Sequence, residues 1–372
     1  MTSIIYVGMD VHTTNYTLCC YSMEDDRFFA EVQVEPDAKN ILKYLARIEK
    51  QQSRDCRIVC GYEAGCLGYS LYHQLHAHGI DCVILAPTTM MTKPGKRIKT
   101  DRRDARLISK CLAFHTYSPV YIPTEVDDAV KEYIRMRDDA NSALARVKQQ
   151  IIAFCIRHGK IHDGKSYWTN KHLEWLSSLD LGNKILSEVL QEYLIRYYQL
   201  REQVDMYDMR INELAQAEPY RQKVEKLGCF RGIAAHTALS FCVEVGDFRR
   251  FATAQQFASY LGLVPGECSS GDKQQYTGIT KAGNSHLRKL LVETAQVFGR
   301  SATKSRKSVA LKERQAKCDS LTVAYADKAN ARLKKKYFKI AMRSKVNIAK
   351  TAVAREMACF IWGMMTDNIS CA

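Results

Sequence analysis

Four acidic residues in the first third of the chain are the best candidates for chemistry. Asp10 ends the apolar segment VGMDVH and Glu63 ends VCGYEAG, so both carboxylates are expected at strand ends in one sheet, where they can converge on a common edge. The segment KTDRRDA then opens an amphipathic helix, with Thr100 as its expected N-cap. Asp101 and Asp104 are three residues apart, which places them on one face of that helix.

Converging carboxylates are what metal-dependent phosphoryl transfer requires. Mg²⁺ prefers oxygen ligands, and at a DNA backbone it neutralises phosphate charge and activates the attacking oxygen. Each acid alone has an ordinary explanation as a turn residue, a loop charge or a helix-start acid favoured by the helix dipole. The order Asp, Glu, Asp, Asp is more specific, and it predicts a Mg²⁺ site made of Asp10, Glu63, Asp101 and Asp104.

A second candidate is a serine in the segment GECSSGDKQQYTGITKAGNSHLRK. Ser269 and Ser270 precede Gly271, which leaves a hydroxyl sterically accessible. Serine is a weak nucleophile unless a base or a metal activates it, and the histidine of this stretch is His286. Activation is therefore expected from the acidic domain, although Ser-Ser-Gly by itself is most often a simple turn.

Basic residues point to a polyanionic partner. Lysine and arginine number 55 against 40 acidic residues, and the net charge of +15 favours nucleic acid, with a merely basic protein as the alternative. Residues 300–356 carry much of this excess and are expected to contact phosphates. Near the serines, Lys281, Asn284 and Arg288 are predicted to bind the nucleic acid.

The cysteines and the apolar segments indicate in which cellular compartment the protein is expected. The 14 cysteines are scattered without a C-x-x-C pair, which is typical of a reduced protein whose cysteines pack as small apolar residues. No apolar run is long enough to span a bilayer. The expectation is a cytoplasmic protein with no membrane role.

Three regions are predicted along the chain. Residues 1–125 alternate strand-like and helix-like segments and are expected to form an α/β domain that opens with a three-stranded meander. Residues 126–222 are charged and helical, and residues 223–372 are mostly helical with glycine-marked turns. The predicted strands of the first region are IIYVGMD, YTLCCYS, FFAEVQV, RIVCGYE and DCVILA.

The middle region contains a heptad pattern, whose apolar positions alternate spacings of four and three. This pattern predicts a coiled-coil arm for oligomerisation, with a helix packed inside its own domain as the alternative. An earlier helix over residues 126–158 is expected to pair with it in antiparallel fashion, either within the chain or between chains. The positions are Leu186, Leu190, Tyr193, Tyr197, Leu200, Val204, Tyr207, Ile211 and Leu214.

Several motifs in a fixed order resemble one known family over nearly the whole chain. They are GMDVH, GYEAG and KTDRRDA in the first region, then FRGI, EVGDFRRF, YLGLVP, SSG and GITKAGNSHLRKLLVETA in the last. The chain resembles the DEDD transposases of the one-ten and eleven-eleven insertion-sequence families, which are related to Piv-type DNA invertases and known as bridge-RNA-guided recombinases.

The resemblance implies a fold, a reaction and partners. It implies a RuvC-like, ribonuclease-H-like first domain whose four acids bind Mg²⁺, and a C-terminal transposase domain whose serine forms a phosphoserine link to DNA. Ser270 matches the family serine best, with Ser269 as a possible substitute. The partners it implies are donor and target DNA, a bridge RNA that selects them, and further subunits in a homodimer or homotetramer that completes the active site.

Two other functions stay open on the sequence. A RuvC-like metal-dependent nuclease or junction resolvase would use water as the nucleophile and leave the serine loop to bind phosphate. A non-enzymatic nucleic-acid binder would need only the basic residues, but the complete set of acids argues against it.

Overall fold

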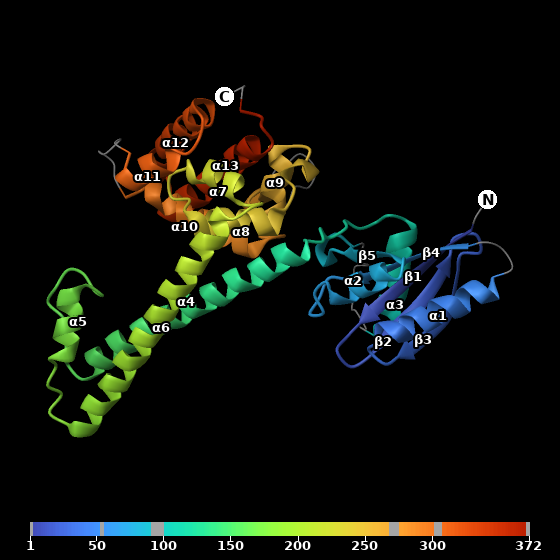
Figure 1. Ribbon diagram of the computed structural model, residues 1–372, viewed down its shortest axis with the longest axis horizontal. Helices are drawn as coiled ribbons and strands as arrows, with labels where there is room; N and C mark the ends of the chain where they lie inside the picture. The colour runs from blue at the N-terminus through green and yellow to red at the C-terminus, as the bar shows by residue number, and fades with distance from the viewer. Residues whose placement is uncertain (1–2, 53–55, 91–99, 268–274, 301–306, 370–372) are drawn as a thin grey trace. The chain divides into compact units, whose positions relative to one another are not determined.

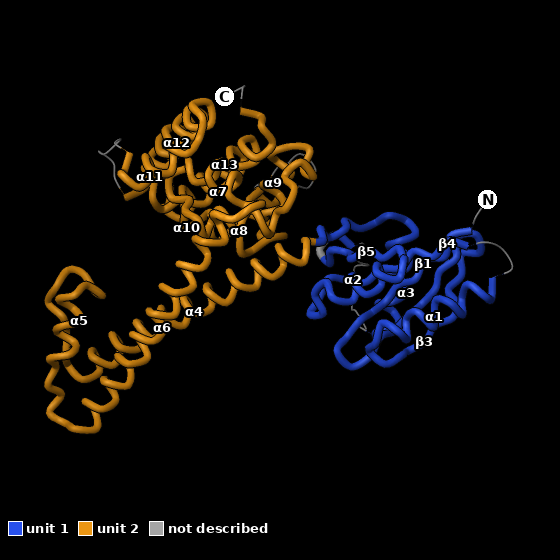
Figure 2. Tube along the Cα trace, in the orientation of Figure 1, with its two compact units in different colours: residues 1–122 blue, residues 123–372 orange. Residues whose placement is uncertain are grey.

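The chain folds into two compact units. The computed structural model describes residues 3–52, 56–90, 100–267, 275–300 and 307–369. Residues 1–122 form an N-terminal unit and residues 123–372 a C-terminal unit (Figure 2). The division falls close to the first predicted boundary, after residue 125, and the second and third predicted regions together make up the C-terminal unit.

The N-terminal unit is built on a five-stranded mixed sheet with the order β3-β2-β1-β4-β5 (Figure 1). The first three strands form an antiparallel meander, and β4 and β5 continue the sheet in parallel with β1. All five predicted strands and the α/β class are confirmed. The strands are β1 (Ser3–Val11), β2 (Tyr16–Ser22), β3 (Arg27–Val34), β4 (Cys56–Glu63) and β5 (Asp81–Leu85).

Helices cover both faces of this sheet, because successive side chains of a strand point to opposite sides. Ile5, Val7 and Met9 of β1 pack in one core with helices α1 (Ala38–Gln51) and α2 (Ser70–Ala77). The alternate residue Tyr6 packs in a second core with helix α3, Asp101–Ala113. Residues of β1 with even numbers therefore face α3, and so does Asp10. A short 3₁₀ turn, η1, covers Pro87–Thr89.

The C-terminal unit begins with two long helices that run antiparallel, α4 (Glu125–Arg157) and α6 (Lys184–Gln216) (Figure 1). Arg137 of α4 donates two hydrogen bonds to Asp208 of α6, at 2.7 and 2.9 Å. Farther along the pair, Phe154 lies 6.0 Å from Tyr193, measured between ring centroids. The short helix α5 (Asn170–Ser177) lies between them in sequence and shares their core.

The predicted heptad positions supply the α6 side of this pairing. Leu190, Tyr197, Val204 and Ile211 are buried, and the first three pack in a core with residues of α4. The predicted antiparallel pairing of these two helices is therefore confirmed, and here both helices belong to the same chain. Tyrosine serves at position 197 because its large flat ring fills the core between the two helices and stacks on Trp168, with the ring centroids 5.0 Å apart.

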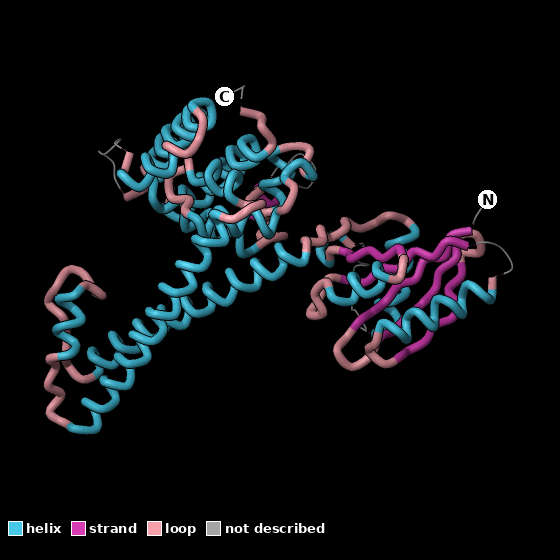
Figure 3. The backbone as a smooth tube through the Cα atoms, viewed as in Figure 1, coloured by secondary structure: helices cyan, strands magenta, loops and turns pink. Residues whose placement is uncertain are grey.

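The remaining helices pack into a second core of the C-terminal unit, centred on α8, α10 and α13. Figure 3 shows that helices dominate this unit, whereas the N-terminal unit combines a sheet with helices. None of the helices in the described ranges is both long and apolar enough to cross a membrane. The elements are α7 (Arg221–Gly228), α8 (Ala235–Val245), η2 (Phe248–Arg250), α9 (Ala254–Tyr260), β6 (Pro265–Glu267), β7 (Tyr276–Ile279), α10 (Ser285–Ala295), η3 (Gln296–Phe298), α11 (Val309–Gln315), α12 (Ser320–Ala341) and α13 (Val346–Met365).

Candidate functional site

Helix α3 lies unusually close to β1 because of one glycine. A Cβ atom added to Gly8 would lie 2.0 Å from the backbone oxygen of Ala105 and 2.4 Å from the backbone nitrogen of Ser109. Any larger residue at position 8 would push the helix away from the sheet. This close approach brings the first turn of α3, which carries Asp101 and Asp104, toward the end of β1.

Asp10 stands at that end of β1 and is mostly buried, with its side chain 14% exposed. One carboxylate oxygen, Oδ1, lies 3.3 Å from Nε2 of His12. The other oxygen, Oδ2, is buried and has no hydrogen-bond partner among the described residues. A buried carboxylate oxygen without a partner is costly, so this atom is suited to accept a hydrogen bond or to ligate a cation.

Asp10, His12 and Asp101 form what we call the acidic cluster. One ligand atom from each of the three residues lies within 4.8 Å of the others. Burial raises the pKa of Asp10; His12 opposes this shift, and the nearby carboxylates of Asp101 and Asp104 add to it. Gathering like charges in a half-buried place costs free energy, and a divalent cation would relieve that cost.

The donor set of the acidic cluster fits a small hard cation. Carboxylate oxygens are the ligands that Mg²⁺ takes, and the free Oδ2 atom of Asp10 supplies one that nothing else in the described chain uses. His12 adds a nitrogen donor, which Mn²⁺ and other transition metals accept more readily than Mg²⁺ does. Asp104 lies close enough to act on the pKa of Asp10.

Glu63 is placed beside Asp10 by the register of the sheet. The parallel pairing of β1 and β4 ends with Met9 opposite Tyr62, so Asp10 and Glu63 are the next residues on the two strands. Both follow a residue that faces α1 and α2, so both face α3. Glu63 is exposed, and its carboxylate lies outside the three-residue cluster.

His12 is the member of the cluster that sequence reasoning missed. It stands two residues after Asp10, and in extended chain this spacing puts two side chains on the same side. The signal was present in the motif GMDVH, but a histidine next to a strand end has no special chemistry until its neighbours in space are known.

The predicted serines, Ser269 and Ser270, lie outside the described residues. The segment around them is framed by the antiparallel strands β6 and β7, which pair through Pro265 with Ile279 and Glu267 with Tyr276. After β7 the chain turns into α10, and Lys281 is exposed on that turn.

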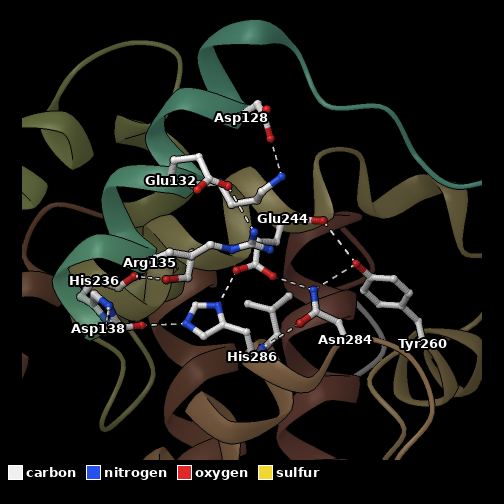
Figure 4. Close-up of polar contacts among 12 residues, drawn as sticks. Asp128, Glu132, Arg135, Asp138, His236, Glu244, Tyr260, Asn284 and His286 are labelled. Carbon is white, nitrogen blue, oxygen red and sulfur yellow. Dashed lines mark hydrogen bonds and ion pairs between the residues drawn. The ribbon is translucent and has the colours of Figure 1, made fainter. Parts of the chain in front are cut away.

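Asn284 and Arg288, both predicted to bind nucleic acid, hold this turn in place. The Asn284 amide donates to Oε2 of Glu244 at 2.6 Å, while its oxygen caps α10 by accepting from the backbone nitrogen of Leu287 (Figure 4). Arg288 donates from Nη1 to the backbone oxygens of Leu261, at 2.9 Å, and Ala282, at 3.2 Å. Both side chains therefore have a structural role, which leaves Lys281 as the most accessible of the three predicted contacts.

His286 lies in a polar network with both of its ring nitrogens engaged (Figure 4). Its Nε2 is 2.8 Å from Oδ2 of Asp138 in α4, and its Nδ1 contacts Oε1 of Glu244 in α8. Nε2 of His236 lies 2.9 Å from the other Asp138 oxygen. We call these four residues the histidine–carboxylate network.

The network fixes the charge of His286. Burial alone would lower the pKa of this histidine, but Asp138 and Glu244 outweigh burial and raise it to about 9. The pKa of Asp138 is correspondingly held far below its usual range, against the effect of burial, by its histidine and arginine partners. An imidazolium with both nitrogens bound to carboxylates is in the wrong state to accept a proton from a serine.

Two family models match the chain. A model described as "Transposase IS116/IS110/IS902 family" matches residues 225–310. A transposase model of the DEDD type matches residues 7–156, a range that includes the acidic cluster and α4.

Individual relatives are similar over most of the chain. The y4qE protein of Sinorhizobium fredii is 35% identical over 82% of this chain and 75% of its own length. The transposase for insertion sequence element IS1533 of Leptospira borgpetersenii is 32% identical over 90% of this chain and 95% of its own. The transposase for insertion sequence element IS1111A of Coxiella burnetii is 26% identical over 68% of this chain and 71% of its own.

Proposed function

Because the chain belongs to the IS110 family of DEDD transposases, enzymes that act on DNA, we propose that it cuts and rejoins DNA strands with Mg²⁺ and a serine nucleophile. The observation that carries the proposal is the buried Oδ2 atom of Asp10 within the acidic cluster, which has no hydrogen-bond partner among the residues that the structure describes. We propose that the protein acts in the cytoplasm, where its DNA substrate would lie.

The N-terminal unit supplies the metal site in this proposal. The sheet order, an antiparallel meander joined to two parallel strands, supports a RuvC-like, ribonuclease-H-like domain. Asp10, Glu63, Asp101 and Asp104 would hold Mg²⁺, and bound metal would neutralise the scissile phosphate and activate the attacking oxygen. The chain's own contribution is to keep these acids together: Gly8 lets α3 approach, and the strand register sets Glu63 beside Asp10.

The nucleophile is the hydroxyl of Ser270, with Ser269 as its substitute. Its oxygen forms a bond to a DNA phosphorus while the bond from that phosphorus to one strand's sugar oxygen breaks, which leaves a phosphoserine link. The hydroxyl end of another strand then attacks this link and releases the serine. His286 is engaged with two carboxylates, and this supports the metal-binding acids as the source of activation.

Nucleic acid would be held mainly by the C-terminal unit. Lys281, Asn284 and Arg288 flank the serine segment, and the basic residues of α11, α12 and α13 would contact sugar–phosphate backbones. A bridge RNA paired with donor and target DNA would then choose the sequence. Sequencing the RNA that co-purifies with the protein tests this part, and the absence of any discrete RNA species would remove it.

We further propose that the enzyme assembles as a homodimer or homotetramer through a coiled-coil arm formed by α4 and α6. The heptad positions of α6 are used within the chain, so contact between subunits would use its other faces. Those faces carry exposed apolar side chains, among them Ile195, Tyr198, Met206 and Met209.

Trapping the covalent intermediate tests the proposed reaction. Wild-type protein and the Ser270→Ala and Ser269→Ala variants are incubated with DNA carrying the element ends and Mg²⁺, and protein–DNA adducts are sought after denaturation. We expect wild-type protein to form an adduct, and we expect this adduct to be lost in Ser270→Ala and in Asp10→Asn. Mixing Asp10→Asn with Ser270→Ala subunits would restore adduct formation if two subunits share one reaction.

The alternative function, a nuclease or junction resolvase that uses water, makes the opposite prediction. The acidic cluster lies wholly within the N-terminal unit, and water could attack there without any serine. Cleavage that survives Ser269→Ala and Ser270→Ala together, with no adduct, would replace the transposase mechanism by hydrolysis.

A further inference from the structure

A basic pocket of about 720 Å³ lies along the contact between α12 and α13. Lys328, Arg332 and Lys336 line it from three successive turns of α12, and Arg355 lines it from α13. Glu356 is the acid among the lining residues. The pocket therefore carries four positive charges against one negative charge.

The carboxylate of Glu356 holds two of the pocket's cations in place but neutralises only part of their charge. The Glu356 side chain is 11% exposed and forms ion pairs with Arg332 and, at 2.6 Å, with Lys336. Burial alone would raise the pKa of Glu356, but these two cations hold it below its usual value. One carboxylate cannot balance both partners, and Lys328 and Arg355 add two further charges. The excess positive charge is turned toward the pocket and favours a polyanion.

The spacing of the cations suits a strand of nucleic acid. Residues four apart on a helix are separated by about 6 Å along its axis, so Lys328, Arg332 and Lys336 form a regular row. Regularly spaced phosphates are the repeating anions of a nucleic-acid backbone, and a row of cations can follow them.

Two aromatic side chains, Tyr325 and Phe360, also line this pocket. Tyr325 is buried, its hydroxyl donates to the backbone oxygen of Phe360 at 3.2 Å, and the two rings meet edge to face at 5.8 Å. Tyr325 thus supports Phe360, which lines the pocket and is only partly buried. Asn368 adds an amide at the exposed rim.

A pocket of this volume with an aromatic ring in its wall can accommodate a nucleobase that is not stacked inside a duplex. Duplex DNA presents a convex backbone with its bases stacked inside, so surface cations are enough to bind it. An unpaired nucleotide can place its base on an aromatic ring while its phosphate meets the cations. We propose that the α12–α13 pocket binds one unpaired nucleotide of single-stranded nucleic acid, with its phosphate on Lys328, Arg332 and Lys336 and its base against Phe360. This inference rests on the proposed function, and it names the form of nucleic acid that the C-terminal unit holds.

Oligonucleotide binding tests the pocket. Single-stranded DNA, single-stranded RNA and duplex DNA of one sequence, about 12 nucleotides long and carrying one 2-aminopurine, are titrated with the full chain at fixed salt. The protein carries Ser269→Ala and Ser270→Ala, so the result is independent of the serine chemistry and of its failure. We expect the fluorescent base to be quenched in a single strand, and the DNA and RNA titrations show which single strand binds more tightly.

Three variants decide the outcome. Phe360→Leu keeps an apolar side chain without a stacking face and should weaken single-strand binding about tenfold while duplex binding stays unchanged. Lys328→Gln should weaken it more than Lys43→Gln, a matched loss of charge at an exposed residue of α1 outside the pocket. Thermal unfolding checks that each variant folds. Equal effects of Lys328→Gln and Lys43→Gln, or unchanged single-strand affinity in a folded Phe360→Leu protein, would overturn the proposal.

Discussion

The two units of this protein each gather histidine and carboxylate side chains, and they do so with opposite results. In the acidic cluster, Asp10 meets another carboxylate and keeps one buried oxygen without a hydrogen-bond partner in the described part of the chain. In the histidine–carboxylate network, both oxygens of Asp138 meet histidine nitrogens and both oxygens of Glu244 have partners. The residue types are alike, so composition does not distinguish the two places.

The difference lies in whether the polar groups are satisfied inside the protein. A network in which both ring nitrogens of His286 and both oxygens of Glu244 are engaged contributes rigidity and ties α4, α8 and α10 together. A group of acids that repel one another, with an oxygen unpaired among the described residues, would be stabilised by a bound cation. The histidine–carboxylate network is therefore structural, whereas the acidic cluster is the place where we propose that a ligand binds.

Removing the charge of Asp10 should have the largest effect. The change Asp10→Asn keeps the shape of the side chain, removes a metal ligand and relieves repulsion, so strand-transfer activity should fall more than about a hundredfold while stability is kept. Asp81→Asn is the matched control, because Asp81 pairs with Arg57 at an exposed place in the same unit. An Asp10→Asn enzyme with more than about a tenth of normal activity would contradict the metal-site role.

Breaking the histidine–carboxylate network should cost stability instead. His286→Asn leaves Asp138 and Glu244 without their shared cation, and unfolding of the C-terminal unit should become easier by about 3 kcal/mol in chemical denaturation. The same substitution at the exposed His78 should cost less than about 0.5 kcal/mol. If His286→Asn kept normal stability but lost strand transfer, His286 would have a role in the reaction and not in the stability of the fold.

Filling the contact between β1 and α3 should disturb the acidic cluster indirectly. The added methyl group of Gly8→Ala would collide with the backbone of α3, so we expect a loss of about 1–3 kcal/mol in unfolding free energy, together with weaker divalent-metal binding. Gly65→Ala is the control, since its methyl group would meet only one backbone oxygen at 3.8 Å. Gly8→Ala protein with wild-type stability would show that α3 is free to move.

The stability contribution of His286 should depend on pH. Its pKa is raised from 6.5 to about 9 in the folded chain, so the imidazolium stabilises the fold fully below pH 6.5. The contribution should decline as pH rises above 6.5 and be lost beyond pH 9, by at most about 1.4 kcal/mol per pH unit. We would compare wild type and His286→Asn by denaturation across this range. A difference between the two proteins that grows with pH would contradict a charged His286.

The sequence predicted the fold well where the signal is local. The five strands of the N-terminal unit, the start of α3 at Asp101 and the antiparallel helix pair follow from alternation, capping and the heptad spacing. Thr100 is the N-cap residue by position, but its side chain makes no capping hydrogen bond. The close approach that Gly8 allows could not be predicted, because a glycine in a strand does not reveal which backbone will face it.

The candidate site was predictable only in part for the same reason. Residue spacing and the resemblance both pointed to four acids and a serine, and neither gave a reason to select His12. Asp138 and His286 are 148 positions apart, and the sequence around either residue does not indicate that the two are in contact. Asn284 and Arg288 looked like phosphate ligands because their types suit that task, whereas their hydrogen bonds to Glu244 and to backbone oxygens depend on the packing of α8, α9 and α10.

Divalent-metal binding tests the account most directly. Mn²⁺, a spectroscopic substitute for Mg²⁺, would be titrated into the full chain and followed by electron paramagnetic resonance, with Asp10→Asn, Asp101→Asn and the control Asp81→Asn measured alongside. The account predicts that wild type and Asp81→Asn bind the ion alike, and that each variant of the acidic cluster binds it at least about tenfold more weakly. Unchanged Mn²⁺ affinity in both Asp10→Asn and Asp101→Asn would contradict it.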